Sequence, residues 1–267
     1  MSLDALMVSF DNVQYFMLMF VRVTSMMMLL PVFGANYIPA QVKIALSLLL
    51  TSALFSVQLV SGLPSLNAAD FSVGLFFLLV IKEALVGLVI GFASSFLFTA
   101  VSFAGRMVDT QMGFGFVELT DPLNEESITV IGQLKTILFT ILFLLFNGHY
   151  FLLLTIQKSF DIIPLFAGVL PSEGLVLHFT VLVTNIFILG FKLAAPVFVV
   201  LILTMIALGI VARTVPQMNI FFVGLPLKIA LGLGTTIIVL PMLISLFRRM
   251  TDGLIQDIWK LLHTMAG

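Results

Sequence analysis

The chain has 267 residues, of which 61% are hydrophobic and only 9% are charged, and its net charge is −1. Soluble domains average about 25% charged residues, so 12 basic and 13 acidic side chains are too few to cover the surface of a water-soluble globule. The near-zero charge gives no basic field for nucleic acid, and the absence of cysteine excludes disulfides, thiol catalysis and thiolate metal sites.

Long apolar stretches without charge predict an all-helical protein of the membrane. A spanning helix needs about 20 mostly apolar residues, and no stretch shows the strict alternation of an outer-membrane strand. The first residues lack a basic start, so we expect the N-terminus to be retained in the first helix. Six long helices are expected, and a shorter amphipathic one follows them: 10–32, 40–61, 71–111, 127–157, 173–211 and 219–247, then 249–264.

Two features of the later helices follow from their residues. Pro196 and Pro226 lie inside apolar stretches, and each is expected to kink its helix because proline lacks the backbone N–H donor. The amphipathic helix at 249–264 is expected to lie on a membrane surface, to dock on a partner, or to pack against its own bundle.

Charged residues within or beside the apolar helices form the first candidate set. A charge that faces lipid costs several kcal/mol, so such residues usually face protein or a water-filled cavity. The pairs in the third helix stand about 34 Å apart at 1.5 Å per residue, so they are either interfacial charges or salt-bridge partners of other subunits. A proton relay is a weaker alternative. The set comprises Lys82, Glu83, Arg106, Asp109, Lys135, Lys192 and Lys228.

A stripe of small residues lies on the same third helix. Gly87, Gly91 and Ser95 recur every four residues, and the two glycines form a GxxxG pattern. Glycine lets helix backbones approach closely in lipid, where packing replaces the hydrophobic effect. The stripe predicts tight helix packing, within the chain or between subunits, and no chemistry.

The segment from 111 to 122 (QMGFGFVELTDP) combines glycines with exposed apolar side chains. Two glycines two residues apart weaken a helix by about 1 kcal/mol each, and apolar residues alternate with them. The segment therefore predicts a hinge that carries an apolar tip. Such a tip suits a movable plug in a pore protein. The residues alone favour a connector tucked between helices.

Motifs for catalysis and cofactor binding are missing from the sequence. There is no GxSxG elbow, P-loop or GxGxxG fingerprint, and the three histidines are scattered without a metal-binding pattern. We therefore expect no enzyme activity, no cofactor and no metal.

Short blocks in a fixed order span nearly the whole chain: PVF at 31–33, IPAQVKIA at 38–45, KEALVG at 82–87, QMGFGF at 111–116, DP at 121–122, FNGH at 146–149, IP at 163–164, ALGIVARTVPQ at 207–217 and NIFFVGLP at 219–226. Each block is weak alone. Together they resemble the FliR family of flagellar type III export proteins and its virulence-system counterparts in the inner-membrane export apparatus. The QMGF and DP blocks favour the flagellar branch.

The resemblance implies a multi-pass protein of the bacterial inner membrane and flagellar basal body. It implies an export gate assembled with FliP and FliQ, which meets FlhB and FlhA and passes unfolded flagellar proteins. Residues 1–172 would resemble a four-helix FliP subunit, and residues 173–267 would resemble a FliQ helical hairpin followed by the amphipathic helix. The alternatives are a secondary transporter of a small molecule and an assembly scaffold that does not line the path.

The resemblance also implies roles for particular residues. The segment from about 112 to 122 would be a plug loop, with Gly113 and Gly115 as its hinge. A hairpin tip would face the cytoplasmic entrance through Arg213, Pro216 and Gln217. Six of the charges named above become candidates for salt bridges between subunits: Lys82, Glu83, Arg106, Asp109, Lys192 and Lys228. The apolar seal of the plug would comprise Met112, Phe114, Phe116 and Leu119.

Overall fold

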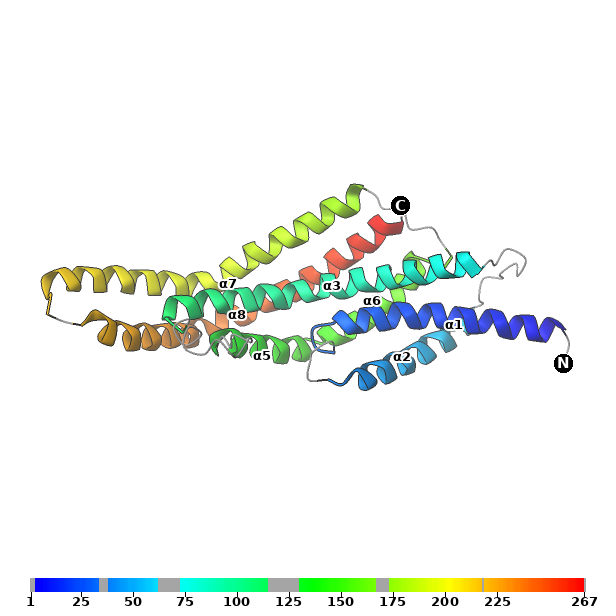
Figure 1. The fold of residues 1–267 in the computed structure, drawn as a ribbon, viewed down its shortest axis with the longest axis horizontal. Coiled ribbons are helices and arrows are strands. Elements are labelled where there is room, and N and C mark those ends of the chain that lie inside the picture. Colours follow the sequence, from blue (N-terminus) through cyan, green and yellow to red (C-terminus); the bar gives the residue numbers. More distant parts are fainter. Residues whose placement is uncertain are drawn as a thin grey trace. The chain divides into compact units, whose positions relative to one another are not determined.

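The computed structural model describes residues 3–33, 38–61, 73–114, 130–166, 173–217 and 219–266. All regular structure within these ranges is helical, which confirms the predicted fold class. In chain order the helices are α1 (Leu3–Leu29), α2 (Ala40–Ser61), α3 (Val73–Met112), α5 (Val130–Leu145), α6 (Gly148–Ile162), α7 (Glu173–Thr214) and α8 (Ile220–Ala266) (Figure 1).

The helix predicted at 127–157 is wrong as a single element, because the chain breaks between α5 and α6. Asn147 has a φ of 58°, a left-handed conformation that asparagine tolerates better than most residues. Its N–H donates to the carbonyl of Leu144 at 3.1 Å, which ends the α-helical ladder. A Cβ on Gly148 would collide with the ring of Phe143, so glycine is required at the restart.

The separate amphipathic helix predicted at 249–264 is also wrong. α8 continues without interruption for 47 residues through Arg248 and Arg249. The break was expected from the change in polarity, but charged residues propagate a helix as well as apolar ones. Pro196 lies inside α7, and Pro226 and Pro241 lie inside α8, so helical structure runs through all three prolines.

Four described helices are long and apolar enough to cross a membrane: Ala40–Leu59, Val73–Met112, Gly174–Thr214 and Phe222–Ala266. α5 and α6 pass the same test only as a pair. Large apolar side chains stay exposed along them, such as Val73 at 76% and Ile238 at 79%. These surfaces require an apolar environment, which agrees with a multi-pass membrane protein.

The chain forms two compact units, each assembled from separate stretches of sequence. Unit 1 comprises residues 1–95, 149–180 and 254–267, and unit 2 comprises residues 96–148 and 181–253. Each unit therefore draws on both sides of residue 172. The predicted division at 172, which concerned likeness to two different subunits, stays a prediction.

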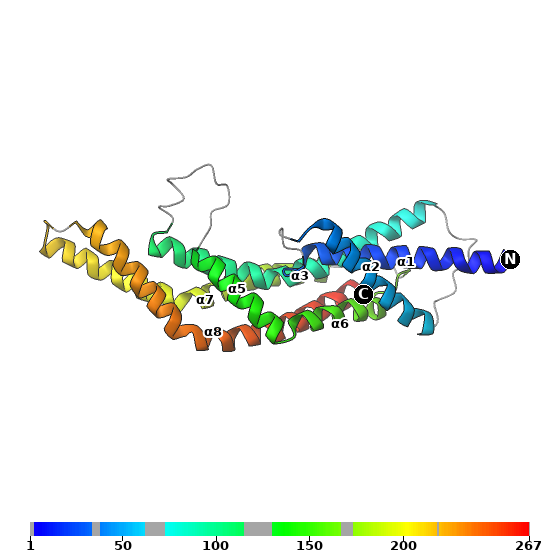
Figure 2. The ribbon, with the colours of Figure 1, turned by 90° about the horizontal axis from the view of Figure 1, so that it is seen from below.

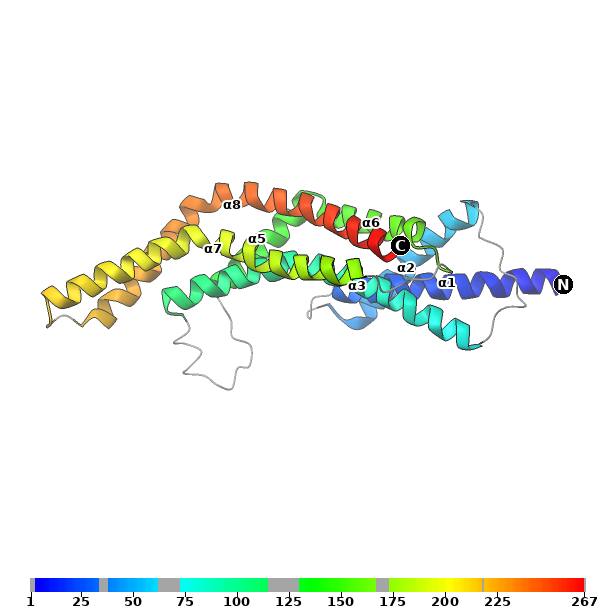
Figure 3. The same cartoon turned by 90° about the horizontal axis from the view of Figure 1, so that it is seen from above.

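Unit 1 contains α1, α2, the first part of α3, α6, the first turns of α7 and the last turns of α8. α1 and α2 lie side by side (Figures 1 and 2), and the rings of Phe16 and Phe55 meet edge to face at 5.6 Å. α6 also lies beside the last turns of α8 (Figure 3), and Lys158 of α6 stacks on the ring of Trp259 of α8 at 3.8 Å. Buried methionine and leucine side chains of α1 fill the centre of the unit: Leu18, Met19, Met26 and Met27.

Unit 2 contains the end of α3, α5 and the hairpin formed by residues 181–214 of α7 and residues 220–253 of α8. The two hairpin helices run side by side in all three views (Figures 1 to 3). Phe139 of α5 is fully buried, and its ring lies 4.8 Å from that of Phe98 and 4.7 Å from that of Phe247. Aromatic packing therefore joins α3, α5 and α8 within this unit.

Candidate functional site

A buried ion pair between α1 and α3 is the first charged cluster. Arg22 is 1% exposed, and its Nε donates to Oε2 of Glu83, which is fully buried. The two remaining guanidinium nitrogens donate to the carbonyls of Ser159 at 2.7 Å and Ile163 at 2.8 Å. Helix ends leave carbonyl groups without intrahelical partners. Arg22 therefore closes the end of α6 while it neutralises Glu83.

Lys82 extends the same cluster. Its Nζ lies 3.0 Å from Oε1 of Glu83 and donates to the carbonyls of Pro164 at 2.9 Å and Leu165 at 2.7 Å. Lys82 and Glu83 thus have intrachain partners, and their predicted contact with other subunits stays a prediction. The sequence reading missed Arg22, although a lone arginine in an apolar helix is itself a signal of a specific partner.

The glycine stripe packs α3 against α1. A Cβ on Gly87 would collide with the carbonyl oxygen of Arg22, and one on Gly91 would lie 2.8 Å from that of Met26. Ser95 hydrogen-bonds the carbonyl of Phe92 at 2.7 Å in its own helix. The two glycines therefore serve close packing inside the chain.

A second cluster lies in unit 2, where the end of α3 meets the start of α5. Asp109 is buried, and its two carboxylate oxygens accept hydrogen bonds from the N–H groups of Ile131 at 3.0 Å and Gly132 at 2.9 Å. A carboxylate at a helix N-terminus satisfies orphan donors and complements the helix dipole. Arg106, three residues earlier, is exposed. Asp109 therefore anchors α5.

Lys135 lies on the next turn of α5 and is only 3% exposed. Its Nζ has no hydrogen-bond partner within the part of the chain that the structure describes. A buried ammonium without partners is costly. The charge of Asp109, the carboxylate at the start of the same helix, offsets part of this cost for Lys135.

The predicted hinge begins with a helix stop. Gly113 has a φ of 94°, its N–H donates to the carbonyl of Thr110 at 3.3 Å, and the N–H of Phe114 donates to that of Asp109 at 3.1 Å. This pattern is a Schellman motif, in which glycine adopts the left-handed position. Gly113 therefore fixes where α3 ends.

The other predicted plug residues divide into described and undescribed ones. Met112 is fully buried, and its methyl group lies against Gly232 of α8, so it anchors the end of α3 in unit 2. Phe114 is half-buried. Gly115, Phe116 and Leu119 lie outside the described residues.

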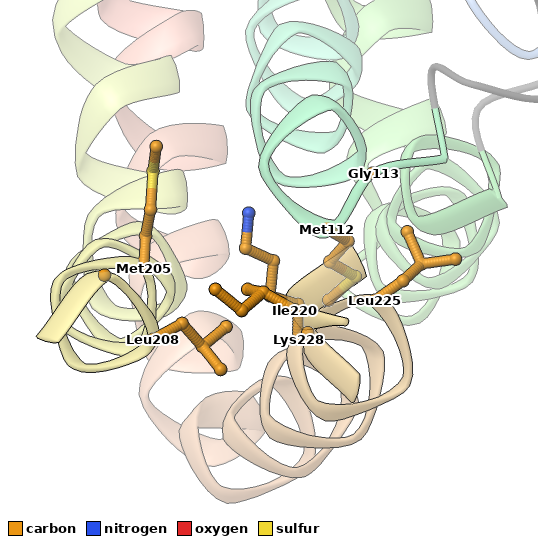
Figure 4. Close-up of a pocket in the computed structure, with 9 residues that line it drawn as sticks. Met112, Gly113, Met205, Leu208, Ile220, Leu225 and Lys228 are labelled. Carbon is orange, nitrogen blue, oxygen red and sulfur yellow. The ribbon is translucent and has the colours of Figure 1, made fainter. Parts of the chain in front are cut away.

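A pocket of about 330 Å³ lies beside this helix stop, between the end of α3 and the α7–α8 hairpin. Its walls are apolar except for Lys228, whose side chain extends into the space between Met205 and Met112 (Figure 4). The structure thus brings Lys228 together with the root of the predicted plug, a proximity that the sequence did not indicate. The other lining residues are Gly113, Leu208, Gly209, Ile220, Gly224 and Leu225.

The remaining predicted residues lie apart from this pocket. Lys192 is exposed on α7, and Arg213, Pro216 and Gln217 are exposed at the end of the hairpin. Met218 lies outside the described residues. The tip is therefore polar and open, as its composition suggested, while its proposed orientation to the cytoplasm stays a prediction.

Replacing Gly113 with alanine is expected to lower the free energy of unfolding by about 1–2 kcal/mol, because a Cβ is strained in the left-handed conformation. Reversible unfolding in mixed micelles, followed by far-UV circular dichroism, measures the change. Gly209→Ala is the matched control, since it lines the same pocket and its Cβ would meet nothing within 4 Å. An equal effect of both substitutions would contradict the assignment of Gly113 as the helix stop.

Comparison with known proteins places this architecture among export components. A family model described as "Bacterial export proteins, family 1" matches residues 13–254. The flagellar biosynthetic protein FliR of Bacillus subtilis is 35% identical over 92% of this chain and 94% of its own length. FliR of Escherichia coli is 31% identical over 83% of this chain and 82% of its own. The surface presentation of antigens protein SpaR of Shigella sonnei is 28% identical over 84% of this chain and 86% of its own.

Proposed function

The chain belongs to the bacterial export protein family 1, and from this premise we propose that it is a core subunit of the flagellar type III protein export gate. In this role it assembles with FliP- and FliQ-type subunits in the inner membrane, where FlhB- and FlhA-type partners meet the gate. The channel passes unfolded flagellar proteins. The observation that carries the proposal is the likeness to FliR along nearly the full length of both chains.

The length of the apolar surface supports assembly with other subunits. Val181 and Ile210 are both exposed and stand 29 residues apart on the part of α7 in unit 2, which is about 44 Å along the helix at 1.5 Å per residue. The hydrocarbon core of a bilayer is only about 30 Å thick. Lipid alone therefore covers one part of this surface, and apolar partner subunits are the natural cover for the rest.

We assign the segment from 112 to 122 as the plug of this channel. Its root is fixed by the buried Met112 and by the helix stop at Gly113. Phe114, Phe116 and Leu119 supply apolar side chains that exclude water and ions at rest, and Gly115 lets the segment move when a substrate arrives. The chain supplies no nucleotide-binding motif, so the driving energy comes from partner components.

Deleting residues 114–118 is expected to raise ion conductance at least about tenfold while the complex still assembles. Gly113 is kept, so α3 retains its stop. The variant is co-expressed with FliP- and FliQ-type chains, its composition is checked by native mass spectrometry, and conductance is recorded in planar bilayers. The control deletes residues 66–70 between α2 and α3, which removes the same length of chain and is expected to leave conductance unchanged.

The rival functions give different results in the same experiment. An assembly scaffold loses complex yield on deletion of 114–118 without any rise in conductance. A secondary transporter catalyses uptake as the purified chain alone and depends on Lys82 or Asp109. Unchanged conductance in a fully assembled complex would refute the plug.

A further inference from the structure

A second hollow, in unit 1, lies far along the chain from the predicted plug and joins the start of α7 to the end of α8. It has a volume of about 460 Å³ and is lined by His178 of α7 and by residues of α8: Gln256, Trp259, Lys260, His263 and Thr264. The two helix ends lie side by side (Figures 1 and 3). None of the lining residues is a carboxylate, so the hollow offers hydrogen-bond donors and positive charge.

Basic groups dominate the surroundings of the hollow. Lys260 and His263 are exposed, and His178 is half-buried opposite them. Lys158 of α6 stacks on the outer side of the site through the ring of Trp259, at 3.8 Å from its centroid. Asp257 lies on the same helix close to His178 and Lys260, and it offsets one of these charges. Two lysines against one carboxylate leave an excess of positive charge, and the imidazoles add hydrogen-bonding groups, so the surroundings favour an anion.

An unpartnered donor also marks the site. The indole Nε1 of Trp259 is buried and has no hydrogen-bond partner among residues 3–33, 38–61, 73–114, 130–166, 173–217 and 219–266. Buried indole N–H groups usually find a partner. Trp259 therefore brings to the lining of the hollow a donor that is unused within the described residues.

The edges of the hollow are apolar and lie at the ends of two candidate membrane spans. Val176 and Leu177, next to His178, are 69% and 64% exposed. The candidate spans of α7 and α8 begin at Gly174 and end at Ala266, so the hollow stands at the ends of both. Tryptophan and basic side chains are typical of this depth, where they meet lipid headgroups. A free phosphate ion gains nothing from such a rim, whereas acyl chains do.

We propose that this hollow binds the phosphate group of an anionic phospholipid. Lys260 neutralises the phosphate, the imidazoles of His178 and His263 donate N–H groups to its oxygens, and Trp259 donates to a headgroup oxygen. The acyl chains extend over Val176 and Leu177. This site is independent of the proposed gate function, because it uses none of the residues assigned to the plug or the pocket at α3.

The test measures lipid binding by the full-length chain in detergent with native mass spectrometry. Phosphatidylglycerol is the anionic probe, and phosphatidylcholine carries the same phosphate with a compensating positive charge. The unmodified chain is expected to bind phosphatidylglycerol about tenfold more tightly than phosphatidylcholine. One basic residue near a membrane surface contributes about a fivefold factor in affinity. Lys260→Gln is therefore expected to weaken phosphatidylglycerol binding about fivefold and to leave phosphatidylcholine binding unchanged.

Two further variants make the result specific. Arg249→Gln removes one positive charge from an exposed position of α8 outside the hollow, and it is expected to change affinity less than twofold. Trp259→Phe keeps a ring for Lys158 and removes only the N–H donor, so a drop of about threefold is expected even if Lys260→Gln proves unstable. Equal effects of Lys260→Gln and Arg249→Gln would overturn the proposal.

Two other outcomes would refute the assignment of the ligand as an anionic phospholipid. If inorganic phosphate stabilises the chain and neither lipid is preferred, the hollow binds a free anion. If Lys260→Gln lowers recovery of FliP- or FliQ-type chains in co-purification while lipid affinity is unchanged, the hollow is an interface between subunits.

Discussion

Replacing Glu83 with glutamine is expected to lower the free energy of unfolding by about 3–5 kcal/mol, because it leaves the buried guanidinium of Arg22 without its counter-charge. Glutamine keeps the size of the side chain, so the change isolates charge from packing. The surrounding groups do not compensate for the lost carboxylate charge, since the other two guanidinium nitrogens of Arg22 already donate to the carbonyls of Ser159 and Ile163. Unfolding in mixed micelles, followed by circular dichroism and by the fluorescence of the single tryptophan, gives the value.

Lys192→Gln is the matched control for this prediction. It also removes one charge from a long apolar helix, but Lys192 is exposed, so a change within about 0.5 kcal/mol is expected. The double replacement Arg22→Met with Glu83→Leu removes both charges and is expected to recover only part of the loss, because the carbonyl of Ile163 loses the donor that Arg22 supplied. A loss below about 1 kcal/mol for Glu83→Gln would mean that solvent reaches Arg22.

Replacing Gly87 with alanine is expected to lower the free energy of unfolding by about 3 kcal/mol, at the upper end of the cost of overpacking. The added methyl group would collide with the backbone carbonyl of Arg22 and with the hydroxyl of Ser25. The hydroxyl can rotate away, but the carbonyl cannot move unless α1 and α3 separate. Their separation would also stretch the ion pair between Arg22 and Glu83, which lies one turn away.

The loss of stability on replacing a glycine with alanine should be largest at Gly87, smaller at Gly91, and absent at glycines that do not pack against α1. Gly91→Ala is expected to cost less than Gly87→Ala, since its Cβ would lie 2.8 Å from the nearest atoms of α1. Gly234→Ala is the control, because its Cβ would meet nothing within 4 Å, and a gain of up to about 1 kcal/mol is expected from helix propensity. Equal losses at Gly87 and Gly234 would show that α1 and α3 do not pack closely in solution. The same unfolding assay serves all three variants.

Coupling between the two predictions distinguishes one packed interface from two separate contacts. Gly87 and Glu83 are one turn apart on α3 and both face α1. Residues that share one interface give non-additive losses. The double variant Glu83→Gln with Gly87→Ala is therefore expected to lose less than the sum of the single losses.

The sequence by itself determined the helical class, the membrane environment and the family. Apolar stretches longer than a bilayer admit few alternatives, because backbone polar groups in lipid must be satisfied within the segment. The glycine repeat at 87 and 91 predicted close packing, since only a missing side chain permits it. The ordered blocks predicted the family, which the comparisons confirm.

Only the tertiary structure decided which residues meet. Arg22 and Glu83 are 61 positions apart, and Lys228 reaches the root of the predicted plug from another helix. The break at Asn147 and the continuity of α8 through Arg248 were also misread. Helix formation follows from neighbours three and four residues away, so periodicity predicts it. Partners across helices are chosen by packing and charge over the whole chain, and no local pattern encodes that choice.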